Sequence, residues 1–120
     1  QRKDVVLIPA GLAADPTFDA QEDWAAATAI ARCAQENARA SGSTLEIGKG
    51  DDAFHHWSER IDTEGLLRLF ESAPHSEKLR NVGLDRDIPY CAQLDITDAV
   101  PEACGRIGPG IVIRRFEKAP

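Results

Sequence analysis

The feature that most constrains the fold is an alanine-rich stretch over residues 20–40, which contains no glycine and no proline. Alanine has the highest helix propensity, and glycine and proline are the main helix breakers, so this stretch predicts one long helix. Asp19 and Glu22 have the spacing of a capping box at its start, and Gly42 is suited to a left-handed cap after its end. We expect its seam of Trp24 and small residues to lie flat on a β layer; the seam comprises Trp24, Ala27, Ala31, Ala34 and Ala38.

Short apolar or alternating segments predict strands in four places. They cover residues 4–9, 44–47, 90–96 and 111–116. A second helix is expected over residues 64–73, with Leu66, Leu67 and Phe70 on one face and Pro74 as its stop.

The remaining segments carry weaker signals. Residues 54–60 have no clear pattern, and residues 75–87 are polar and predict a long connection. Residues 99–104 are expected to form a single helical turn, before a turn at Gly108–Gly110.

Together these segments predict an α/β or α+β fold in the order β-α-β-α-β-β. It has a four-stranded mixed sheet, with the long alanine-rich helix and the second helix packed on it, and its last two strands are antiparallel. No linker or internal repeat is visible, so residues 1–120 are predicted to form a single globular domain.

Composition excludes some classes of function. The chain has 20 acidic against 14 basic residues and a net charge of -6, which argues against a nucleic-acid partner because such proteins need a positive surface. No apolar run approaches the roughly 20 residues that a membrane-spanning helix requires, so no membrane span is expected.

The three cysteines are Cys33, Cys91 and Cys104. Cys91 and Cys104 flank a turn-rich segment, so a disulfide between them is possible, whereas Cys33 falls in the alanine-rich helix and is expected to be inert. A disulfide and an N-terminus without Met favour an exported or periplasmic protein over a cytoplasmic one, although the latter stays open.

The densest group of reactive side chains lies in residues 51–59. Asp51 and His55, like Asp52 and His56, are four residues apart and would be neighbours on a helix. A carboxylate that orients an imidazole is a common acid–base arrangement, so the candidate catalytic residues are His55, His56, Asp52 and Glu59. Adjacent histidines on a helix point about 100° apart, which disfavours a shared metal ion, and we assign neither a metal nor a cofactor.

Trp57 and Arg60 follow the histidines and have the composition of a protein-binding hot spot, so they are the candidate binding residues. A core position is the alternative for Trp57, and it is the more common one for tryptophan. Three functions remain open from the sequence. The first is a small acidic protein-interaction module, such as an accessory subunit, an inhibitor or an immunity-type protein, with another protein as partner. The second is a small enzyme that uses the cluster of residues 51–59 for acid–base chemistry. The third is a protein that binds a metal or a small ligand.

Overall fold

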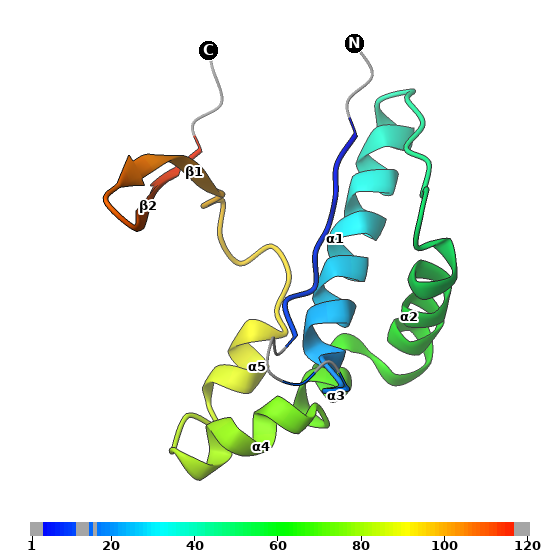
Figure 1. The fold of residues 1–120 in the computed structure, drawn as a ribbon. Coiled ribbons are helices and arrows are strands. Elements are labelled where there is room, and N and C mark those ends of the chain that lie inside the picture. Colours follow the sequence, from blue (N-terminus) through cyan, green and yellow to red (C-terminus); the bar gives the residue numbers. More distant parts are fainter. Residues whose placement is uncertain (1–3, 12–14, 16, 117–120) are drawn as a thin grey trace.

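The computed structural model describes residues 4–11, 15 and 17–116. It contains five helices and one antiparallel pair of strands in these residues (Figure 1). The helices are α1 (Gln21–Ala40), α2 (Asp51–Glu64), α3 (Leu66–Glu71), α4 (Pro74–Asn81) and α5 (Asp87–Cys91), and the strands are β1 (Pro101–Ile107) and β2 (Gly110–Arg115). None of the described helices is both long and apolar enough to cross a membrane.

Helix α1 confirms the prediction from the alanine-rich stretch almost to the residue. Gly42 follows it at φ 73°, in the left-handed region that glycine tolerates best. The capping box is wrong, because the N-cap residue is Ala20 and makes no side-chain cap.

The face that α1 buries also differs from the predicted seam. Its buried residues are Gln21, Ala25, Thr28, Ala29 and Ala31, and none of the helix residues after Ala31 is buried. Trp24 is exposed and does not anchor the helix. The helix therefore packs through its N-terminal half against other helices rather than along its length on a sheet.

The core lies where α1, α2 and α3 meet. Ala25, Trp57 and Leu69 form its buried centre, and Leu69 is completely buried. Gln21 ties the helices together, because its Nε2 donates to the Leu69 carbonyl at 2.6 Å and to Ser72 Oγ at 2.8 Å. The core is thus small and entirely helical.

The predicted four-stranded mixed sheet is wrong. Residues 4–9 and 44–47 form no strand, and residues 90–96 begin inside α5 and continue as irregular chain. A strand needs a neighbouring strand for its backbone hydrogen bonds, and in the described part of the chain the sheet consists of β1 and β2 alone.

The hairpin at the C-terminal side is partly as expected. Strand β2 confirms the prediction over residues 111–116, and it pairs antiparallel with β1, with a register shift between Ala103 and Gly105. The helical turn predicted over residues 99–104 is wrong, because this stretch enters β1 instead.

Helices α2 and α4 cover segments for which no helix was predicted. Helix α2 includes residues 54–60, and α4 begins at Pro74 in the segment expected to be a connection. Proline suits the first position of a helix, where its missing N–H costs nothing, so Pro74 starts α4 as well as following α3. Gly65, at φ 84°, separates α2 from α3.

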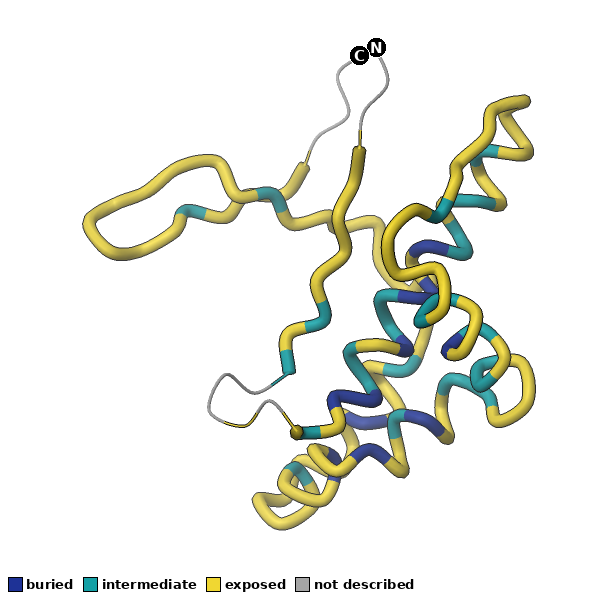
Figure 2. The backbone as a smooth tube through the Cα atoms, turned by 45° about the vertical axis from the view of Figure 1, so that its right-hand side comes forward, coloured by how far each residue is buried: buried dark blue, intermediate teal, exposed yellow. Residues whose placement is uncertain are grey.

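The chain is more open than its length requires. Its radius of gyration is 16.3 Å, whereas a compact domain of this length has about 14 Å. Figure 2 shows why, because the tube is exposed along residues 4–8 and along most of the β1–β2 hairpin, while the buried residues lie in the helices or directly before them, at Ala20 and Ala73.

Candidate functional site

Helix α2 places the predicted catalytic cluster on an exposed surface. Asp51 Oδ1 and His55 Nε2 lie 3.2 Å apart, as the four-residue spacing predicts, but both side chains are more than half exposed (58% and 71%). For Asp52, His56 and Glu59 no ion pair is found within the described residues, and the ring of His56 meets that of Trp57 edge-on with centroids 5.4 Å apart. The structure brings together only Asp51 and His55 from this cluster, on solvent-facing helix surface.

Trp57 belongs to the core rather than to an exposed hot spot, because only 8% of it is accessible. The Arg60 guanidinium lies 4.9 Å from the centroid of the Trp57 ring, and Arg60 Nε donates to Glu64 Oε1 at 2.6 Å. This ion pair raises the pKa of Arg60 and holds the pKa of Glu64 below its usual range. Both interactions fix Arg60 against its own helix.

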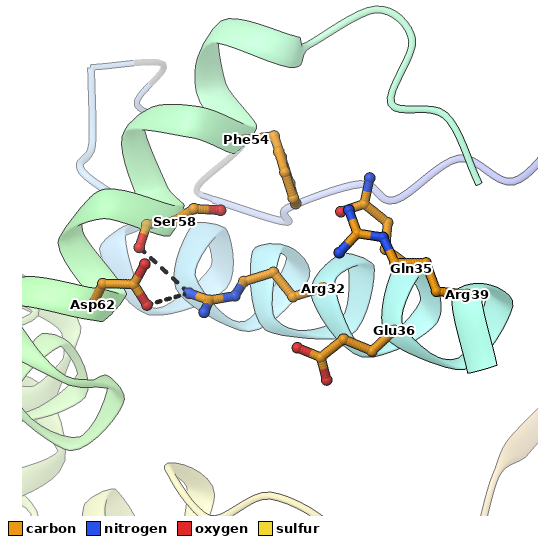
Figure 3. Close-up of a pocket in the computed structure, with 7 residues that line it drawn as sticks. All are labelled: Arg32, Gln35, Glu36, Arg39, Phe54, Ser58 and Asp62. Atoms are coloured by element: carbon orange, nitrogen blue, oxygen red, sulfur yellow. Dashed lines mark hydrogen bonds and ion pairs between the residues drawn. The ribbon is translucent and has the colours of Figure 1, made fainter. Parts of the chain in front are cut away.

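An open pocket of about 250 Å³ lies between α1 and α2 (Figure 3). Arg32 Nη1 pairs with Asp62 Oδ1 at 2.8 Å and donates to the Ser58 carbonyl at 3.4 Å, which binds the two helices to each other. The lining residues are Arg32, Gln35, Glu36, Arg39, Phe54, Ser58 and Asp62. Two acidic and two basic residues line this pocket, so it has no net preference for an anion.

A second histidine–carboxylate pair lies where α1 meets α4. His75 Nδ1 is 3.2 Å from Glu22 Oε1, although the two residues are 53 positions apart in the chain. The Glu22 side chain is only 16% exposed, whereas that of His75 is 48% exposed. Glu22 Oε2 is buried and finds no hydrogen-bond partner in the described parts of the chain. The carboxylate is therefore held inside the fold, while the imidazole faces outward.

The loop before α1 surrounds this pair with further polar and aromatic groups. The Phe18 ring meets the His75 ring edge-on with centroids 6.0 Å apart, and Lys78 Nζ lies 5.2 Å from the Phe18 centroid. Hydrogen bonds from Thr17 hold the pKa of Asp15 below its usual 3.8. The neighbouring Asp23 Oδ2 accepts a bond from the Gly11 N–H at 2.9 Å. We name Glu22, His75, Lys78 and Phe18 the junction cluster.

Sequence reasoning missed the junction cluster because its members come from two distant helix starts. Glu22 was interpreted as a capping residue, and His75 lay in a segment expected to be a connection. The available signal was Pro74, since proline at a first helical position would have placed His75 and Lys78 one turn apart on the same helix face.

The cysteines and possible metal ligands add no second site. Cys91 and Cys104 are free, exposed thiols in this structure, on α5 and β1, and Cys33 is partly buried; the disulfide stays a prediction. Within residues 4–11, 15 and 17–116, no group of three or more His, Cys, Asp or Glu side chains is arranged to hold a metal ion.

Comparison with known proteins reveals the family. The family model described as 2-phosphosulpholactate phosphatase matches residues 1–105. A Carboxydothermus hydrogenoformans relative named "Probable 2-phosphosulfolactate phosphatase" is 35% identical over 99 residues, which are 82% of this chain and 37% of the relative. A Clostridium novyi relative of the same name is 32% identical over 99 residues, 82% of this chain and 38% of the relative. No solved structure matches.

These relatives correct the function expected from the sequence. A non-catalytic protein-interaction module is wrong as the main interpretation, because both relatives carry the name of an enzyme. The alternative prediction of a small enzyme is better supported. The chain spans a little over a third of the length of these relatives, 37% and 38%. With a family model matched from residue 1 to residue 105, the chain belongs to the 2-phosphosulpholactate phosphatase family.

Proposed function

We propose that the protein hydrolyses a phosphate ester of the 2-phosphosulfolactate type, and that this chain supplies the junction cluster to the reaction. The observation that carries the proposal is the family match over residues 1–105, which includes every residue of the cluster. The substrate class comes from the names of the relatives, and it implies a small molecule with a phosphate, a sulfonate and a carboxylate group.

The geometry of Glu22 and His75 supports an acid–base role. Hydrolysis requires water to attack phosphorus while the ester oxygen leaves with a proton. Glu22 binds the imidazole at Nδ1, so Nε2 is the atom that remains for proton transfer. In the proposed step water attacks phosphorus, and the protonated imidazole gives its proton to the leaving oxygen as the P–O bond of the ester breaks. The imidazole then takes up a proton from the attacking water, which restores its protonated form.

Lys78 is the basic residue of the junction cluster, and in this proposal it binds the anionic substrate. It lies three residues after His75 on α4, so both side chains project from the same face of the helix. The pocket at Arg32 is less suitable, because ten residues of helix separate Arg32 from Glu22, or about 15 Å. A three-carbon substrate is too short to reach both places.

The test compares the two histidine–carboxylate pairs, which have the same 3.2 Å separation. Phosphate release from 2-phosphosulfolactate is measured for this chain alone. The same assay is run on a chimera of the Carboxydothermus relative in which this chain replaces the aligned stretch. His75→Asn is expected to lower the rate by about 10²- to 10⁴-fold, the usual contribution of general acid–base catalysis.

His55→Asn is the matched control and should leave the rate within about twofold of the parent. Glu22→Gln should reproduce most of the His75→Asn effect and shift the pH profile, because the amide cannot stabilise an imidazolium. A folded chimera that releases no phosphate contradicts the proposed function. Loss of activity with His55→Asn but not with His75→Asn would move the reaction to the cluster on α2.

A further inference from the structure

Four consecutive apolar residues near the N-terminus are exposed. The exposed fractions of Val5, Val6, Leu7 and Ile8 are 78%, 78%, 41% and 82%. Their backbone groups make no hydrogen bond with any described residue. We name Val5–Ile8 the N-terminal apolar segment.

The pattern of this segment is typical of a strand that is covered on both faces. Successive side chains of an extended chain point to opposite sides, so an unbroken apolar run puts apolar groups on both of them. Such runs are characteristic of strands inside parallel sheets, whereas strands with one wet face alternate apolar and polar residues. The segment therefore requires strand neighbours on its edges and packing on its faces.

The accessible surface of the chain is larger than that of a self-contained protein of its mass. The accessible surface is 9623 Å², while a self-contained monomer of 13.1 kDa exposes about 6,400 Å². The excess is of the order that a large permanent interface covers.

The chain that follows the carboxyl end of the N-terminal apolar segment is held beside the junction cluster. The Gly11 N–H donates to Asp23 in the first turn of α1, next to Glu22. A strand over residues 5–8 would thus run toward Glu22 and His75 with its carboxyl end. Sites in α/β proteins lie at the carboxyl ends of their strands, so this placement fits a site at the junction.

We propose that Val5–Ile8 is a β-strand that inserts into a sheet supplied by the part of the family fold that this chain does not span. The relatives have nearly two thirds of their length outside the aligned stretch, which is enough to form such a sheet. A second copy of this chain fits less well, because it would bring the same uncovered apolar faces and a further charge of -6. Two strands alone also leave both faces wet.

The test mixes this chain with its complement, the Carboxydothermus relative from which the aligned stretch has been deleted. Both are combined in urea and refolded together by dilution, so that neither has to fold alone. A soluble one-to-one complex is expected. In that complex the amides of residues 5–8 should exchange with solvent at least about 100-fold more slowly than in the chain alone.

Two variants and a control locate the contact. Val6→Asp and Ile8→Asp place a charge in the docked strand and should weaken the complex at least about 100-fold. Ile30→Asp changes an isoleucine of α1 that is 57% exposed, and it should have little effect. All three should leave the melting of the chain alone unchanged, which excludes loss of folding.

Three outcomes would overturn the proposal. The first is a chain that stays separate while the complement folds or precipitates without it. The second is a complex in which residues 5–8 exchange as fast as before. The third is a dimer of this chain with slow exchange at residues 5–8, which would make a second copy the occupant. The inference rests on family membership and not on activity, so binding without phosphate release would count against the proposed function only.

Discussion

The helical body and the two extended arms use similar amino acids in opposite ways. The body, residues 17–92, surrounds Leu69 completely, whereas the arms, residues 4–8 and the β1–β2 hairpin, contain no buried residue. The arms carry isoleucines at Ile8, Ile111 and Ile113 that are 82%, 58% and 64% exposed. Apolar composition alone therefore does not tell which segments form a core, because burial also needs a partner surface at the right distance.

The largest difference between the two regions is expected when one apolar side chain is shortened in each. Leu69→Ala should lower the free energy of unfolding by about 2–5 kcal/mol, because it leaves a cavity in a completely buried site. Ile113→Ala should change it by less than about 0.5 kcal/mol, since that side chain is mostly exposed. Urea denaturation followed by the fluorescence of Trp24 and Trp57, both in the helical body, measures both. Equal losses would mean that the hairpin is part of the same cooperative unit.

The same contrast explains what could be predicted from the sequence. Helix α1 was predictable because alanine favours a helix locally, without help from distant residues. The β2 strand was also predictable, because the turn at Gly108 and Pro109 brings its partner β1 next to it along the chain.

The failures share one physical cause. Residues 4–9 have the composition of a strand, but a strand needs a neighbouring strand to pair with, and the described residues do not provide one. The pairing of Glu22 with His75 depends in the same way on how the fold places the first turn of α4 beside the first turn of α1. No local pattern encodes such a contact, so the candidate cluster on α2, whose members are close in sequence, was the one that sequence reasoning found.

Within the body, a buried side-chain hydrogen bond should contribute more to stability than an exposed one. Gln21→Ala should cost about 1–3 kcal/mol, because it removes the donor that satisfies the buried Leu69 carbonyl. Gln35 is the matched control, since its Nε2 donates to the Leu45 carbonyl at 3.3 Å on an exposed surface. Gln35→Ala should cost less than about 0.5 kcal/mol in the same denaturation experiment. A similar loss for both would show that exposure does not decide the value of these bonds.

A glycine substitution tests whether the hairpin folds independently of the body. Gly108→Ala forces a side chain into the left-handed region, at φ 58°, and should cost the hairpin about 1–2 kcal/mol. Gly48→Ala is the control, because an added Cβ also meets open space there but the backbone is not left-handed. Amide exchange should speed up in β1 and β2 for Gly108→Ala alone, with the melting midpoint of the body unchanged. A lower midpoint would contradict an independent arm.

The smallest effect on stability is expected from the exposed ion pairs, one in each region, and it should depend on pH. Arg60 lowers the pKa of Glu64 below its unfolded value of about 4.5, so the stabilisation is present above that pH and is lost as the pH falls through the lower folded value. Glu64 lies in the last turn of α2, where the helix dipole opposes a negative charge, and the bidentate contact with Arg60 offsets this. Glu64→Gln should therefore be less stable than the parent at neutral pH, and the difference should vanish as the pH falls through the lowered folded pKa of Glu64. Glu102→Gln removes the corresponding exposed pair with Arg114 in the hairpin and should leave the unfolding of the body unchanged at every pH, because that pair is no part of the body. Urea denaturation midpoints of the parent and the two variants, measured across this pH range, test both expectations. A parallel loss of stability in both variants would show that the hairpin unfolds together with the body.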